Sequence, residues 1–179
     1  NTALGYQTLN AVPSGGGGFN TAIGYQASLK NTSGSGNVSL GYGSLVENTT
    51  SSDNTAVGVF ALNLLDNGAS SSGNVAIGSV ALGNGQFLTF NTAVGNGALA
   101  SANGVSGTPS TNNSALGFNA LNKNTTGNNN SAFGRGALRY NISGDRNVAI
   151  GVSALLNNTS GTRNTAVGNS SLQNNSTGT

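Results

Sequence analysis

The sequence contains no cysteine, histidine, methionine or tryptophan, and only 6% of its 179 residues are charged. Without cysteine the chain can form neither a disulfide nor a thiolate metal site, and without histidine it lacks the commonest general base and metal ligand. No apolar run approaches the roughly 18 residues that a membrane-spanning helix needs. These absences argue against an enzyme, against a metal or cofactor site, and against a membrane-spanning helix in this segment.

Basic residues are also sparse, because the lysine and arginine side chains occur singly along the chain. A nucleic-acid-binding surface needs basic residues gathered on one face. We therefore expect no nucleic-acid partner. The six basic residues are Lys30, Lys123, Arg135, Arg139, Arg146 and Arg163.

Small and polar residues dominate what is present, with 29 glycines among many asparagines, serines and threonines, and 35% of the residues are hydrophobic. Disordered chains usually combine low hydrophobicity with a high net charge. The net charge here is only +2. This composition favours stacked β-structure over a random coil.

One short unit recurs along the whole chain. It begins with Asn, then Thr, Val or Ser, then Ala or Ser, then a large apolar residue and Gly, and it continues to a small residue followed by Leu. Successive units start 19, 17, 17, 20, 17, 22, 17, 17 and 17 residues apart, so the period is 17 and three units carry insertions. Residues 1–179 therefore form one array of ten units, which start at Asn1, Asn20, Asn37, Asn54, Asn74, Asn91, Asn113, Asn130, Asn147 and Asn164.

Three unit positions, numbered from the first asparagine, are nearly constant. Position 5 is always glycine: Gly5, Gly24, Gly41, Gly58, Gly78, Gly95, Gly117, Gly134, Gly151 and Gly168. Position 4, here called the pre-glycine row, is always large and apolar: Leu4, Ile23, Leu40, Val57, Ile77, Val94, Leu116, Phe133, Ile150 and Val167. Position 9, the leucine row, contains Leu9, Leu45, Leu62, Leu82, Leu99, Leu121, Leu138, Leu155 and Leu172, whereas the second unit has Ser28 there and Leu29 one residue later.

A unit of 17 residues is too short for two packed helices, and Thr, Val and Ile favour strands. Alternation places positions 2 and 4 on one face of a strand and position 3 on the other. Positions 4 and 9 are five residues apart, so burial of both rows needs a bend, which the glycine allows. The repeat therefore predicts a parallel β-solenoid of ten coils, each with two short strands, a glycine corner and a return loop that takes the insertions.

The tandem motifs Asn-Thr-Ala-Val-Gly and Asn-Val-Ala-Ile-Gly, each followed by a small residue and Leu, resemble the head repeats of trimeric autotransporter adhesins. They are also similar to shaft repeats of phage and large-virus fibres, and the resemblance covers all ten units. It implies a left-handed parallel β-roll, a homotrimer, and display on a cell or virion surface. Independently, a thin coil buries little surface, and sharing one face among three chains would add burial.

Six units carry an Asn-x-Ser/Thr triplet at position 12, and glycine directly follows five of these triplets. Asn at the first and Gly at the fourth position suit a type I turn, whereas the triplet itself is an acceptor for N-glycosylation. Two hypotheses remain open, a turn alone and a turn that also carries a glycan. The six candidate residues are Asn31, Asn48, Asn124, Asn141, Asn158 and Asn175.

Two further rows of the repeat each have two interpretations, one as a binding surface and one as ordinary contacts between coils. An aromatic row at position 6 could bind sugars or a receptor, but stacking between coils is ordinary sheet chemistry; it comprises Tyr6, Tyr25, Tyr42 and Phe118. A threonine row at position 2 could bind ice, but valine and serine interrupt it, which favours a simple strand ladder. Its members are Thr2, Thr21, Thr55, Thr92 and Thr165.

The four carboxylates do not occupy one recurring position of the unit. Paired carboxylates are what a polysaccharide-processing solenoid would need. Dispersed ones in return loops are predicted to be solvated charges, and the glycine run at 15–18 lacks the Lys-Ser/Thr of a phosphate-binding loop. The acidic residues are Glu47, Asp53, Asp66 and Asp145.

The sequence therefore predicts an architectural protein, namely a segment of an extracellular fibre that serves as a spacer or adhesin shaft on a cell surface. A viral tail or receptor-binding fibre is the alternative, and an ice-binding solenoid is a weaker one. We expect self-association, as a homotrimer or an end-to-end filament, with a host surface, matrix receptor or glycan as a further partner. Because neither end of the array has an atypical capping unit, we also expect an interior segment of a longer fibre.

Overall fold

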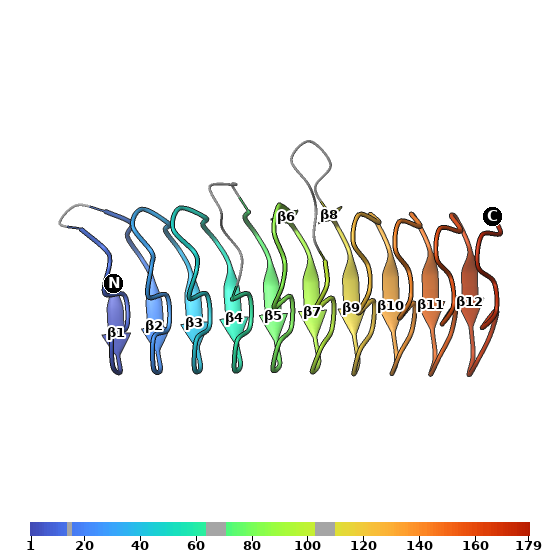
Figure 1. Ribbon diagram of the computed structural model, residues 1–179, viewed down its shortest axis with the longest axis horizontal. Coiled ribbons are helices and arrows are strands. Elements are labelled where there is room, and N and C mark those ends of the chain that lie inside the picture. The colour runs from blue at the N-terminus through green and yellow to red at the C-terminus, as the bar shows by residue number, and fades with distance from the viewer. Residues whose placement is uncertain (14–15, 64–70, 103–109) are drawn as a thin grey trace.

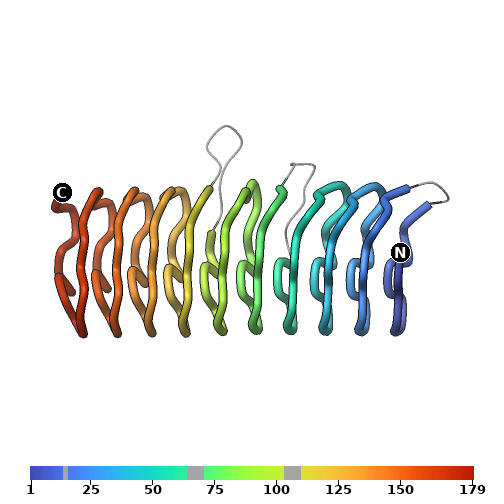
Figure 2. The backbone as a smooth tube through the Cα atoms, turned by 180° about the vertical axis from the view of Figure 1, so that it is seen from behind, coloured from blue at the N-terminus to red at the C-terminus, as the bar shows by residue number. Residues whose placement is uncertain are grey.

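The computed structural model describes residues 1–13, 16–63, 71–102 and 110–179. The protein is all-β and forms a parallel β-solenoid, whose coils stack in a row with the two termini at opposite ends (Figures 1 and 2). Residues 14–15, 64–70 and 103–109 belong to the first, fourth and sixth units, which carry the insertions. The prediction that the insertions lie in the return loops therefore concerns residues that are largely outside the described ranges.

Ten three-residue strands, one from each unit, form a single sheet in which spatial order follows chain order. All pairs are parallel and in register, so that Ala56 lies opposite Ala76, and Val57 opposite Ile77. Residues of equal unit position thus lie one above the other. The strands are β1 (Thr2–Leu4), β2 (Thr21–Ile23), β3 (Val38–Leu40), β4 (Thr55–Val57), β5 (Val75–Ile77), β7 (Thr92–Val94), β9 (Ser114–Leu116), β10 (Ser131–Phe133), β11 (Val148–Ile150) and β12 (Thr165–Val167).

The prediction of a second strand in every coil was wrong. In the described parts of the chain, the only further strands are β6 (Leu88–Thr89) and β8 (Ser110–Thr111), which pair with each other. After the glycine, positions 7 and 9 adopt positive φ, for example 53° at Phe60 and 48° at Leu62. These left-handed residues interrupt extended structure. Backbone hydrogen bonds between coils nevertheless continue, since Leu62 N–H donates to the Ala81 carbonyl at 3.0 Å.

The hydrophobic core lies between the strands and the returning segment, and it is built from alanine and leucine. Positions 3, 8 and 9 supply it, so that Ala93, Ala98 and Leu99 are fully buried in one coil. The predicted burial of the leucine row is confirmed from Leu45 to Leu155, all of whose leucines are fully buried. Alanine at two positions allows the two sides of the coil to pack closely.

The pre-glycine row is not buried in this chain, and that part of the prediction was wrong. Seven of its ten side chains are exposed, from Leu4 in the first strand to Val167 in the last. The alanine at position 3 points into the core, so alternation turns position 4 outward. A bend at the glycine cannot change this, because the strand that precedes the bend already fixes the direction of the position 4 side chain.

The position 5 glycines adopt a conformation that other residues rarely reach, with φ between 122° and 137° in all ten units. Gly95 has a φ of 131°, and a Cβ atom there would lie 2.6 Å from the carbonyl oxygen of Gly117 in the next coil. Both backbone conformation and close approach therefore require glycine. These residues form the corner at which the chain leaves the strand.

Candidate functional site

The first asparagine of each unit belongs to a buried hydrogen-bond ladder. Asn37 Oδ1 accepts a hydrogen bond from the backbone N–H of Asn54 at 3.0 Å, and Asn37 Nδ2 donates to the carbonyl of Ser51 at 2.9 Å. The same two bonds recur in every unit from Asn20 to Asn147. Each side chain thus closes its own coil and joins it to the next, which explains why asparagine recurs here.

A second buried ladder, in two separate runs (Asn31 with Asn48, and Asn124 to Asn158), contains five of the six asparagines of the Asn-x-Ser/Thr triplets. Asn141 Nδ2 donates to Asn124 Oδ1 at 2.7 Å and to the Gly144 carbonyl, three residues on, at 2.9 Å. Asn158 Nδ2 repeats the bond to Asn141 Oδ1 at 2.8 Å. The bond to the residue three positions later is the side-chain closure of a turn. The members of this ladder are Asn31, Asn48, Asn124, Asn141 and Asn158, each at most 1% exposed.

This ladder bears directly on the glycosylation hypothesis. A glycan is attached through Nδ2 of asparagine, which is the atom that makes both ladder bonds. A sugar on a buried member would have to open the ladder. Asn175, in the last unit, is only partly buried and its Nδ2 lies 3.5 Å from Asn158 Oδ1. The geometry counts against a glycan on the five buried asparagines, because their Nδ2 atoms are buried and hydrogen-bonded.

Exposed apolar side chains cover the outer face of the ten-stranded sheet. The pre-glycine row supplies one large apolar side chain per strand, of which seven are exposed and three are half-buried, and Val38 at position 2 adds another exposed one. We call this surface the pre-glycine face. Soluble monomers rarely expose a continuous apolar strip of this kind, and such strips usually mark interaction surfaces.

The aromatic row forms a stack along the first units. The rings of Tyr6, Tyr25 and Tyr42 stack at centroid distances of 5.3 and 5.1 Å, and Phe60 meets Tyr42 edge-on at 5.0 Å. Phe118, six units on from the first tyrosine by repeat order, is exposed and outside this stack. The contacts between coils are those that ordinary cross-strand aromatic pairing provides.

Among the described residues the predicted carboxylates do not come together in a chemical site, and in the threonine row only Thr2 and Thr21 lie directly side by side. Glu47 pairs with Lys30 at 2.6 Å on the surface, and Asp145 Oδ1 accepts a bond from the Asn128 N–H at 2.7 Å, while Asp66 lies outside the described residues. Across the described ranges, no three acidic side chains gather where they could hold a metal ion. The same ranges contain no helix with the length and apolarity to cross a membrane.

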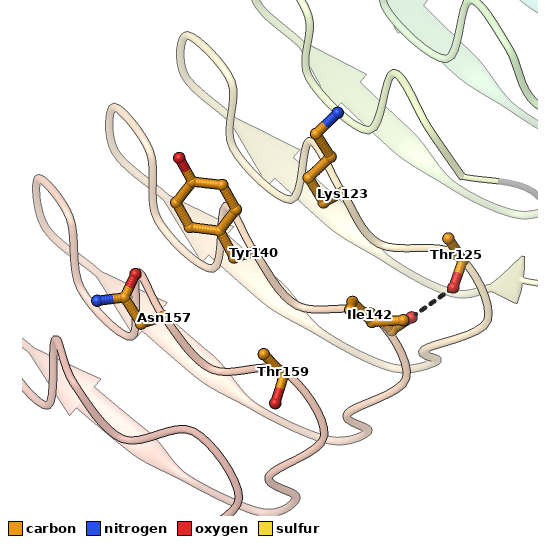
Figure 3. A pocket seen from close by; sticks show the side chains of 6 residues that line it. All are labelled: Lys123, Thr125, Tyr140, Ile142, Asn157 and Thr159. Atoms are coloured by element: carbon orange, nitrogen blue, oxygen red, sulfur yellow. Dashed lines mark hydrogen bonds between the residues drawn. The ribbon is translucent and has the colours of Figure 1, made fainter.

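A recess of about 670 Å³ opens on the side of the coil opposite the strands, in the seventh to ninth units. Sequence reasoning missed it, although a signal was present. In the six units that carry the Asn-x-Ser/Thr triplet, position 13 is threonine in four and serine in one, and position 11 is a charged or amide residue in five. The eighth unit departs at both, with Ile142 and Tyr140. The recess is lined by Lys123, Tyr140 and Asn157 of position 11, and by Thr125, Ile142 and Thr159 of position 13 (Figure 3).

No protein-family model, curated protein or solved structure matches this chain. Its function is therefore argued from the repeat, the fold and the exposed surfaces.

Proposed function

We propose that this chain is a structural segment of an extracellular fibre, a spacer or adhesin shaft displayed on a cell surface, and that three copies associate through the pre-glycine face. The observation that carries the proposal is the apolar row along all ten strands, seven of whose ten side chains are exposed. Each coil contributes one large apolar residue to it. Full burial of such a side chain contributes about 1.5–3 kcal/mol, and covering the half that is exposed here would contribute about half of that for each residue.

The architecture suits a spacer. Ten coils at a strand spacing of about 4.8 Å give a rod of roughly 48 Å per array, and each coil contacts only its neighbours. Most of the polar side chains that hold the coils together are asparagines, with serines and threonines beside them. Because these side chains are uncharged, their hydrogen bonds are little affected by salt. A rod of this kind can hold another domain away from a surface.

The resemblance to trimeric adhesin repeats supports three copies rather than two, and it also supports a left-handed coil. A viral tail or receptor-binding fibre is the alternative, because the repeats resemble both kinds of shaft. An ice-binding surface fits less well, since Val38, Val75 and Val148 interrupt the threonines of the outer face.

Light scattering of the 179-residue chain tests the association. We expect about three times the 17.5 kDa of one chain. Ile150→Asp, on the pre-glycine face, should reduce the mass to that of one chain, because a charge would be buried in the interface. Ile142→Asp is the matched control, because this isoleucine is similarly exposed but lies on the opposite side of the coil.

A monomeric mass for the unmodified chain, or equal effects of the two substitutions, would contradict the trimer. Display on a surface is tested separately, by antibody labelling of intact cells that make the protein. Labelling only after the cells are broken open would contradict the extracellular assignment.

A further inference from the structure

The recess around Tyr140 has the chemistry of a ligand site, and it lies on the opposite side of the coil from the pre-glycine face. We propose that this recess binds an anionic saccharide, with carboxylated or sulfated sugar rings. The site is complete within one chain. It therefore goes beyond the shaft function and does not depend on the trimer.

The floor of the recess is apolar although two of its residues are threonines. Thr125 Oγ1 donates a hydrogen bond to the Ile142 carbonyl at 2.9 Å (Figure 3). Thr159 Oγ1 likewise donates to the Ser176 carbonyl at 3.1 Å. Each hydroxyl is thus held by the backbone of the following coil. The threonine methyl groups and the Ile142 side chain remain to contact a ligand.

Tyr140 supplies a flat aromatic surface beside this floor. Its side chain is 40% exposed, and Figure 3 shows the face of its ring, with Lys123 on one side and Asn157 on the other. The guanidinium carbon of Arg139 lies 5.2 Å from the ring centroid, a cation–π contact that helps to hold the ring in place. The apolar C–H face of a sugar ring can pack against such a surface.

Polar groups at the rim match the hydroxyl and acidic groups of a sugar chain. The Lys123 ammonium can donate hydrogen bonds to a carboxylate or sulfate. Asn157 Nδ2 donates to Asn174 Oδ1 at 3.0 Å, which orients the Asn157 amide at the other edge of the recess. A hydrophobic small molecule suits this site less well. Such ligands are usually 70–90% buried or more in an enclosed pocket, whereas this recess is open to solvent on one side of the coil.

The charge of this region favours an anion. Residues 90–179 contain five basic side chains and one acidic one, a net charge of +4, whereas residues 1–89 contain one basic and three acidic, a net charge of −2. Arg135 and Arg139 line an adjoining smaller recess of about 120 Å³. A local excess of positive charge raises the concentration of anionic ligands and their rate of association.

Comparison with the second unit shows that this is not a general property of the repeat. Lys30 occupies the same unit position as Lys123, but the next coil places Glu47 beside it, and the two form an ion pair at 2.6 Å. In the coil after Lys123 the equivalent residue is Tyr140. The same unit position therefore holds lysine in two settings. Lys30 is paired with Glu47, whereas Lys123 lies beside the Tyr140 ring.

Isothermal titration calorimetry with three hexasaccharides tests the proposal: a heparin fragment, hexagalacturonate and neutral maltohexaose. We expect at least one anionic probe to bind at least tenfold more tightly than maltohexaose, with an affinity that falls as salt is added. Binding of the heparin fragment alone would identify sulfated sugars as the ligand, and binding of hexagalacturonate alone would identify carboxylated ones.

Variants locate the binding site. Tyr140→Ala should weaken binding about tenfold, the scale of truncating an aromatic anchor, and Lys123→Gln should weaken it several-fold and reduce its salt dependence. Tyr25→Ala and Lys30→Gln are matched controls, since Tyr25 is 43% exposed in the aromatic row and Lys30 shares the unit position of Lys123. Both should leave the affinity unchanged.

Three results would overturn the saccharide site: no binding of either anionic probe, equally tight binding of maltohexaose, or equal losses in the control variants. The mass of every variant is measured by light scattering in parallel. A monomeric chain that still binds the anionic probe would refute the trimer and leave the saccharide site intact.

Discussion

The leucine row and the pre-glycine row are equally regular along the sequence, yet the fold places them in opposite environments. In the seventh unit, Leu121 is fully buried, whereas Leu116, five residues earlier, is 48% exposed. One leucine and two alanines per coil complete the core of a single chain. Recurrence of an apolar residue thus shows that it must be covered, without showing whether the same chain or another one covers it.

The glycine corner lies between the two rows, and its substitution should have the largest effect on stability. Gly95→Val forces a β-branched residue to a φ of 131° and brings its Cβ within 2.6 Å of the Gly117 carbonyl oxygen. We expect a loss of more than about 3 kcal/mol in the free energy of unfolding, since the clash adds to backbone strain of about 1–3 kcal/mol. Chemical denaturation at fixed protein concentration measures it.

Gly18→Val is the control for this substitution, because a Cβ atom there meets nothing within 4 Å. We expect its unfolding midpoint to stay close to that of the unmodified chain. Similar losses in both variants would show that the close approach of the coils at Gly95 is not what requires glycine.

The inner row should show the next largest effect. Leu121→Ala leaves a cavity in a coil whose other core residues are alanines, and we expect a loss of about 2–5 kcal/mol. Leu172→Ala, in the same row but half exposed in the last unit, should cost much less. Denaturation of both variants tests this, and equal losses would contradict the distinction between buried and exposed members of the row.

A substitution in the buried asparagine ladder tests whether inward-facing polar side chains contribute as much to the free energy of unfolding as the leucines do. Asn141→Ala removes bonds to Asn124, Gly144 and Asn158, and leaves buried partners unsatisfied. We expect a loss of about 1–3 kcal/mol. Asn174→Ala, at an exposed site, is the control. An Asn141→Ala protein as stable as this control would mean that water replaces the ladder bonds.

Much of the fold could be predicted from the sequence because it depends on the repeat. The period of 17 and the alternation at positions 2 to 4 led to the parallel ladder, in which Thr55, Ala56 and Val57 pair with Val75, Ala76 and Ile77. Alternation had also assigned position 4 to the face opposite the alanine. The error came from assuming that a regular apolar row must be buried within its own chain.

Other features are invisible to pattern reasoning for physical reasons. Leucine rarely adopts positive φ, yet Leu62 does so at 48°, because coil-to-coil bonds and burial outweigh the local cost. The leucine side chain gives no sequence signal that its backbone adopts positive φ. The Tyr140 recess could have been noticed, since Ile142 departs from the threonines at position 13, but only stacking of the coils shows that both residues share one surface.

The outer row should give the smallest effect on a single chain and the clearest effect on assembly. Leu116→Ala removes a side chain that is about half exposed in the isolated chain. Below the concentration at which trimers form we therefore expect a loss of no more than about 1 kcal/mol. At higher concentration the unmodified chain gains stability from association and the variant gains less. Unfolding midpoints at two protein concentrations, with the mass measured at each, separate these contributions. If Leu116→Ala destabilised the protein as much as Leu121→Ala, or equally at both concentrations, the two rows would be alike in energy and the pre-glycine face would have no need of a second chain.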